Sequence, residues 1–186
     1  MNDADLIERS LVDGRLFEPL FDRHYRAIHR YFNARAGVAA ADDLASETFT
    51  IAFRRRGSYD LSCTDAAPWL YGIALNLLRG HRRSEENRRR THARVAASAS
   101  DSQNGSAEVF DKNGGVSLAL LDLDEQDRDL IILFAWAELS YEQLGAAFGL
   151  PVGTVRSRLS RIRARMRESL SVPESEGTVA DGTPER

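Results

Sequence analysis

LSYEQLGAAFGLPVGTVRSRLSRIRARMRESL, residues 139–170, is the stretch that decides the fold of the C-terminal part of this chain. Apolar residues recur at helical spacing through Phe148, and Gly149 and Pro151 then break the pattern. Glycine tolerates the positive φ of a tight turn, and proline suits the first turn of a new helix. From Val152 a second helix is predicted, with one buried stripe at Val155, Leu159, Ile162 and Met166. Two helices joined by a short glycine-containing turn form the unit that places its second helix in a DNA major groove.

The opposite face of the second predicted helix carries hydrogen-bonding and cationic side chains. Arginine reads guanine bidentately in the major groove, and arginine or serine also binds phosphates. A solvated arginine-rich face is the alternative for any basic helix. Because these residues cluster directly after the turn, DNA contact is favoured for Arg156, Ser157, Ser160 and Arg161, flanked by Arg158, Arg163, Arg165 and Arg167.

Length and composition limit the other possibilities. The chain has 186 residues, of which 42% are hydrophobic, enough for one medium or two small domains. No apolar run approaches the roughly 20 residues that span a bilayer, and the acidic N-terminus does not resemble a signal peptide. We therefore expect a cytoplasmic protein without membrane insertion. The single cysteine, Cys63, excludes an internal disulfide and a cysteine-based zinc site, and we expect neither a metal nor a cofactor.

The charge is unevenly distributed. The net charge is −3, yet residues 54–94 contain ten arginines against four acidic residues. The acidic residues collect at both termini and around residues 122–129. Two basic patches on an acidic chain indicate two local contacts with nucleic acid rather than general DNA coating.

The remaining pattern predicts an all-α protein with two small helical domains. Helices are expected over residues 3–12, 16–36 and 41–55, then from Pro68 through a basic stretch, and over 118–123 and 127–137. Gly37 is placed to end the second of them. We assign residues 1–94 to the first domain, 95–116 to a flexible linker rich in small and polar residues, 117–171 to the second domain and 172–186 to a disordered tail.

Three blocks in this order carry a family resemblance: ADDLASETFTIAFRR (41–55), WLYGIALNLLRGHRR (69–83) and the helix-turn-helix, most of all at PVGTVRSR (151–158). The chain resembles an extracytoplasmic-function (ECF) RNA polymerase sigma factor of the sigma-70 family. The resemblance covers residues 16–83 and 118–170. It implies that the first domain is sigma domain 2 and the second is sigma domain 4, in a bacterial protein that binds core RNA polymerase and directs transcription initiation at promoters in a stress or signal response.

The resemblance implies a role for the 41–55 helix in docking on the coiled coil of the polymerase clamp, formed by the largest subunits. Opposite charges on that basic surface would set orientation and association rate. The alternative is that acids near a helix N-terminus stabilise its dipole, with Asp42 or Asp43 as an N-cap. The implied core-polymerase-binding residues are Asp42, Asp43, Leu44, Glu47 and Phe49.

Promoter DNA is the second partner that the resemblance implies. Strand opening needs bases held outside the stack and cations on the backbone. The implied contacts to the downstream promoter element are Tyr59, Asp60, Asn76, Arg79, Arg82 and Arg83, whereas Trp69 is expected in the core. The implied contacts to the upstream element are Thr154, Arg156, Ser157, Arg158, Ser160 and Arg161, which include the face derived above from periodicity.

Parts of the sequence are also compatible with two other classes of protein. A helix-turn-helix regulator that binds an operator would explain residues 139–170 but not the basic N-terminal helical block. An enzyme is disfavoured because the four histidines are scattered and no HExxH, phosphate-binding loop or nucleophile elbow is present, so no catalytic residue is assigned. ECF sigma factors are commonly held inactive by an anti-sigma factor that wraps both domains, which makes such a factor a further expected partner.

Overall fold

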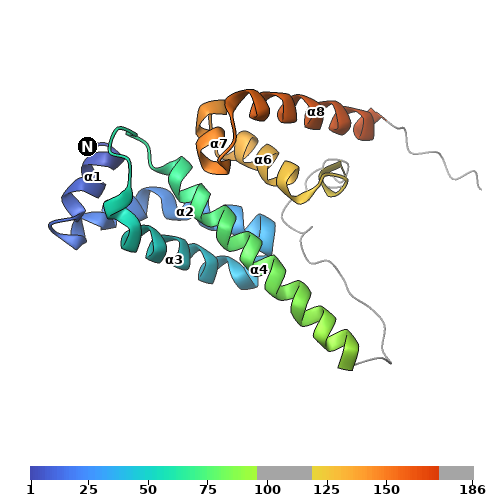
Figure 1. The fold of residues 1–186 in the computed structure, drawn as a ribbon, viewed down its shortest axis with the longest axis horizontal. Coiled ribbons are helices and arrows are strands. Elements are labelled where there is room, and N and C mark those ends of the chain that lie inside the picture. Colours follow the sequence, from blue (N-terminus) through green and yellow to red (C-terminus); the bar gives the residue numbers. More distant parts are fainter. Residues whose placement is uncertain (96–118, 172–186) are drawn as a thin grey trace, which may run out of the picture.

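The computed structural model describes residues 1–95 and 119–171, and this part of the chain folds into two helical domains (Figure 1). The N-terminal domain contains α1 (Asp3–Ser10), a 3-10 turn η1 (Gly14–Phe17), α2 (Glu18–Ala36), α3 (Val38–Arg55), η2 (Arg56–Ser58) and α4 (Ala67–Val95). The C-terminal domain contains α6 (Glu125–Trp136), α7 (Tyr141–Phe148) and α8 (Val152–Ser171), preceded by a helical turn over residues 119–121. The all-α prediction is confirmed. The expected linker, apart from Val95, and the expected tail lie outside the described residues.

Gly37 separates α2 from α3 and sets where the acidic residues of α3 lie. Its φ of 81° ends α2, and the same glycine is the N-cap of α3. The third helix therefore begins at Val38, three residues before the predicted start. Asp42 and Asp43 lie inside this helix, so the alternative that one of them is an N-cap is wrong.

The core of the N-terminal domain lies between α2, α3 and α4. Leu20, Ile28 and Phe32 of α2 and Leu70 and Leu78 of α4 are fully buried. Small residues of α3, such as Ala45 and Ala52, allow the three helices to approach closely. The second half of α4 continues beyond this core as a basic arm (Figure 1).

The C-terminal domain closes around the predicted stripe of α8. Val155, Leu159 and Ile162 have no solvent exposure and pack with Leu130 and Leu133 of α6 and Leu144 of α7. Met166 is partly buried at the end of this core. Periodicity alone therefore identified the buried side of the second helix.

The two domains also pack against each other. Helix α7 lies on α4 (Figure 1), and one contiguous hydrophobic cluster includes residues of both domains. At the closest approach Gly72 of α4 faces the backbone of α7, where an added Cβ would lie 3.3 Å from the Ala147 carbonyl oxygen. Across the helices of the described ranges, none has the length and apolarity required of a membrane span.

Candidate nucleic-acid interface

The turn between α7 and α8 is defined by caps on both sides. Ser140 and Gln143 form a capping box at the start of α7, with reciprocal hydrogen bonds between side chain and backbone. Gly149 ends α7 in the left-handed conformation, with φ 66° and ψ 36°. The N–H groups of Gly149 and Leu150 both donate to the Gly145 carbonyl. These bonds fix the direction in which α8 leaves the turn.

The outward face of α8 presents the residues that the sequence placed there. Arg156, Ser157, Ser160 and Arg161 are exposed, on the side opposite the buried stripe. Arg156 lies 5.7 Å from the centre of the Tyr141 ring, a cation–π contact that orients its guanidinium. Thr154 is half-buried in the first turn of α8, and its carbonyl accepts a hydrogen bond from the Ser157 hydroxyl.

Arg158 lies differently from its neighbours. Its Nε and Nη2 atoms each lie 2.9 Å from Oδ1 of Asp127 on α6, and its Nη1 donates to Gln126. The pair is largely buried, with side-chain exposures of 19% and 16%. Arg158 therefore ties α8 to α6, and its guanidinium is directed at a carboxylate within the domain.

Some of the residues predicted to contact the downstream promoter element are exposed, and others are paired with residues of the protein itself. Asp60, Asn76 and Arg83 are exposed, and half-buried Arg79 donates to the Asn76 side chain at 3.3 Å. Hydrogen bonds from the hydroxyl and N–H of Ser62 hold the pKa of Asp60 below its usual range. Arg82 instead faces two acidic residues of α6, a contact that no local sequence pattern indicates.

Tyr59 lies inside the loop rather than on its surface. Only 9% of the residue is exposed, and its ring packs edge-on against Trp69 at 5.0 Å. Its hydroxyl lies 2.7 Å from the Cys63 carbonyl oxygen and 3.1 Å from that of Asp65. Burial raises the pKa of this tyrosine above its usual value. The expectation that Tyr59 contacts a base directly disagrees with this position, because the ring holds the loop together; Trp69 packs on the core, as expected.

Helix α3 carries an exposed acidic edge. Asp43 and Glu47, four residues apart, lie on one exposed face, and Asp42 lies 3.0 Å from the Nε2 atom of His29. Next to this edge, α3 and α4 form an open groove of about 540 Å³. Its lining includes Leu44, Ile51, Arg55, Ile73, Asn76 and Leu77.

Leu44 and Phe49 have different positions on α3. Leu44 is half-buried and lines the groove, so part of its side chain is available to a partner. Phe49 is only 4% exposed and packs against Phe21 at 4.8 Å and Tyr25 at 6.0 Å. The expected direct contact of Phe49 with polymerase disagrees with this burial. Helical spacing alone did not distinguish the core side of α3 from its outer side.

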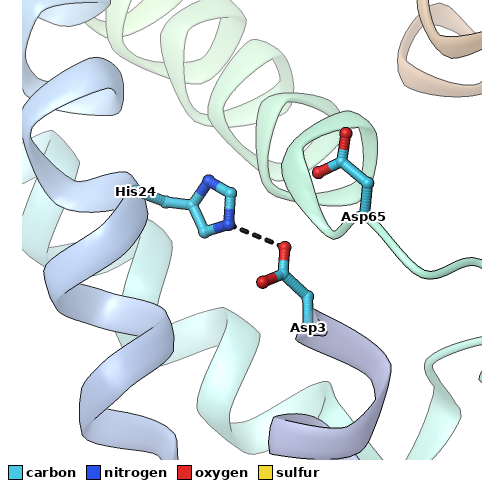
Figure 2. A group of neighbouring side chains, drawn as sticks. All are labelled: Asp3, His24 and Asp65. Atoms are coloured by element: carbon cyan, nitrogen blue, oxygen red, sulfur yellow. Dashed lines mark hydrogen bonds and ion pairs between the residues drawn. The ribbon is translucent and has the colours of Figure 1, made fainter. Parts of the chain in front are cut away.

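Asp3, His24 and Asp65 form a cluster whose ligand atoms lie within 4.8 Å of one another (Figure 2). The Asp3 carboxylate accepts hydrogen bonds from Arg23, from His24 Nε2 at 2.8 Å and from the N–H of Ala66 at 2.9 Å. Burial raises the pKa of Asp3, but the bonds from His24 and Ala66 outweigh it and leave the pKa below the usual value. By accepting these three hydrogen bonds, the Asp3 carboxylate links α1 to α2 and to the loop before α4.

The fold and site define a two-domain helical DNA-binding protein. Residues 20–89 match the family described as Sigma-70 region 2, and residues 115–166 match Sigma-70, region 4. The ECF RNA polymerase sigma factor SigW of Bacillus subtilis is 31% identical over 160 residues, covering 80% of this chain and 83% of SigW.

Two of the solved structures that resemble this chain cover most of its length. One is CnrH in complex with the cytosolic domain of CnrY, with a TM-score of 0.66, 26% identity and coverage of 90% of this chain and 96% of that chain. The other is the sigma factor RpoE in complex with the anti-sigma factor NepR from Bartonella quintana, with a TM-score of 0.60, 25% identity and coverage of 84% and 98%.

The chain therefore belongs to the sigma-70 family, as an ECF sigma factor. It is a transcription initiation factor that directs RNA polymerase to promoters, which confirms the resemblance noted from the sequence. A regulator that only binds an operator is not favoured, because the match to region 2 covers the N-terminal block that such a regulator would leave unexplained.

Proposed function

We propose that this sigma factor binds core polymerase through the acidic edge and groove of α3, and binds promoter DNA through α4 and α8. The observation that carries the proposal is the arrangement of α8. Four exposed polar and cationic residues follow a capped turn, and behind them Val155, Leu159 and Ile162 are fully buried. An α-helix held in this way presents its first turns to a major groove.

The surface of α3 suits a helical and basic partner. Asp43 and Glu47 supply charge along one edge, while Leu44 and the groove supply an apolar floor. Charge complementarity orients the encounter, and apolar burial then stabilises it. The polymerase clamp is the partner that we assign to this surface. Phe49 contributes by holding α3 against α2.

Helix α4, from Asn76 into its basic arm, suits single-stranded promoter DNA. Asn76 offers an amide for base edges, and Arg79 and Arg83 offer cations for the backbone. Binding the separated strand lowers the free energy of the open promoter, so this role needs no catalytic group, metal or cofactor. We place the protein in the bacterial cytoplasm, where polymerase and promoters are located, and assign its activity to a stress or signal response.

An anti-sigma factor is the further partner that we propose. The RpoE structure that resembles this chain contains the anti-sigma factor NepR. The groove beside α3 and the contact region between the domains are surfaces that such a protein would compete for.

The upstream assignment is tested by Arg156→Ala, alone and with Arg161→Ala, in transcription by core polymerase plus this protein, with start sites read by sequencing the transcripts. A good bidentate base contact is worth about 1–3 kcal/mol, or about 5- to 150-fold in affinity. We expect Arg156→Ala to lower initiation at the native promoters within this range, while capture of core polymerase stays unchanged.

Arg167→Ala is the matched control. It removes an exposed arginine from the same helix, about 16 Å further along its axis. Its initiation should stay close to that of the unmodified protein. Equal initiation by the Arg156→Ala, Arg161→Ala and Arg167→Ala variants would show that the first turns of α8 do not read the promoter.

A further inference from the structure

A buried group of charges joins the two domains. Arg35 of α2 and Asp129 of α6 have side-chain exposures of 2% and 3%, and the Arg35 Nε lies 2.6 Å from Asp129 Oδ1. The Nη2 atom of Arg35 lies 2.7 Å from Glu125, and the Tyr31 hydroxyl donates to Asp129 at 3.0 Å. Every one of these interactions crosses from one domain to the other.

Arg82 of α4 completes the group. Its Nη1 atom lies 2.6 Å from Glu125 Oε2 and 3.3 Å from Asp129 Oδ2. Two arginines of the N-terminal domain thus face two carboxylates of the C-terminal domain. A buried charge is tolerated only beside a partner, so this matching specifies how the domains pack. When the domains separate, water hydrates all four charges, and neither domain retains an unpaired buried ion.

Close packing extends the contact from Arg82 toward the start of α4 and onto α2. Near its start, Gln143 of α7 donates to Asp65 at 2.6 Å. In the second turn of α4, Gly72 allows the α7 backbone to approach, and any side chain there would press on the Ala147 carbonyl. On the α2 side, Arg30 donates to the Trp136 carbonyl at 3.0 Å and lies 5.7 Å from its ring.

We propose that this closed packing is the resting state of the free protein, and that the charge group formed by Arg35, Arg82, Glu125 and Asp129 is an intramolecular latch that opens when the protein engages polymerase and the promoter. The carboxylates of α6 occupy the position beside Arg82 that a DNA phosphate would take. While the domains are packed, Nη1 of Arg82 is paired with these carboxylates and Nη2 is buried, so DNA binding at Arg82 and closure compete. The competition with DNA rests on the downstream promoter contact that the family resemblance implies for Arg82, which we carry into the proposed function of α4, whereas the closed state itself does not.

The closed state is tested with the free full-length protein by energy transfer between two dyes. Cys63 is the only cysteine and is exposed, and Ala146→Cys adds an exposed position on α7. Cys63 lies in the loop whose Asp65 contacts α7, so the two dyes are close when the domains are packed. We expect high transfer in this parent protein.

Two changes should open the latch by independent routes. Gly72→Gln inserts a side chain against the α7 backbone, and Asp129→Asn removes a charge that two arginines share. Each should raise the open population by roughly tenfold or more, seen as lower transfer and a larger radius of gyration in X-ray scattering. Circular dichroism checks that helix content is kept, and if one variant does not fold, the other decides.

Matched controls make the same chemical changes away from the contact. Gly80→Gln alters the same helix at a glycine whose added Cβ would meet no described atom within 4 Å. Asp122→Asn removes an exposed charge of the same domain. Both should keep the transfer of the parent. Low transfer in the parent, or unchanged transfer in folded Gly72→Gln and Asp129→Asn, would overturn the closed resting state without affecting the promoter assignments.

Adding core polymerase and promoter DNA tests the opening step. We expect transfer in the parent to fall on binding. High transfer in an assembly that initiates transcription would show that the latch stays closed during function, and the proposal of opening would fail.

Discussion

The left-handed turn at Gly149 allows a prediction worked directly from backbone geometry. Gly149 has φ 66° and ψ 36°, and among the described residues no atom lies within 4 Å of the position its Cβ would take. An alanine side chain there would neither pack against nor clash with another residue, so only the cost of the backbone conformation affects stability. A left-handed conformation costs an L-residue roughly 1–2 kcal/mol. Gly149→Ala should lower the free energy of unfolding of the C-terminal domain by this amount.

Two other glycines of the same unit provide controls for this prediction. Gly153 lies within α8, again with open space over its Cα in the described structure, so Gly153→Ala should stabilise by up to about 1 kcal/mol through helix propensity. Gly145→Ala should destabilise, because its Cβ would lie 2.8 Å from the Leu150 carbonyl oxygen. Gly149→Asn should cost less than Gly149→Ala, since asparagine tolerates this conformation.

Urea unfolding followed by circular dichroism measures these differences. The slope against urea should stay constant across the series, which shows that only stability has changed. Stability of Gly149→Ala equal to or above that of the unmodified protein would refute the reasoning. The turn would then not depend on a left-handed residue, and the direction of α8 would have to be fixed by its packing alone.

The remaining predictions concern α3 and the N-terminus. Asp43→Arg with Glu47→Arg should weaken capture of core polymerase in a pull-down while helix content is kept, because both exposed carboxylates lie on the face assigned to the clamp. Asp13→Arg, at an exposed position outside α3, is the control. Equal capture by the double variant and by the control would remove the assignment. Asp3→Asn should destabilise the fold at neutral pH. Because the pKa of Asp3 is lowered on folding, its contribution is present above the unfolded value near 3.8 and is lost as pH falls through the folded value, so the difference between variant and parent should shrink in acid; a constant difference would contradict it.

Local chemistry predicted the helix-turn-helix well. Helix α7 spans Tyr141–Phe148, as the apolar spacing and the glycine that follows it indicated. The α8 stripe was also read correctly, because buried residues at steps of three and four define one helical face. The start of α3 was missed since Gly37 both ends one helix and caps the next, which leaves no separate signal for the second start.

Local sequence patterns do not predict contacts between residues that lie far apart in the chain. Arg35 and Asp129 are 94 residues apart and each reads as an ordinary surface charge in the sequence. The family resemblance implied contacts at Phe49 and Tyr59. Aromatic side chains suit both cores and binding surfaces, so only three-dimensional packing shows that these two are buried in the free protein. The acidic cluster near residues 122–129 was visible, but its partners were not.

The acidic residues of α6 pair with arginines, which explains why a DNA-binding protein carries an acidic helix. On α6, Asp127 holds Arg158 within the same domain, while Glu125 and Asp129 hold Arg35 and Arg82 across the domain boundary. Both kinds of contact are arginine–carboxylate pairs, but their effects differ because one lies within a domain and the others lie between domains. The pair within the domain persists in every arrangement of the domains and therefore braces α8 against α6. The pairs between domains exist only while the domains touch, so they compete with whatever else binds Arg82. Helix α6 thus braces α8, which we propose reads the upstream element, in every arrangement of the domains, and it restrains an arginine of α4 only while the domains are packed.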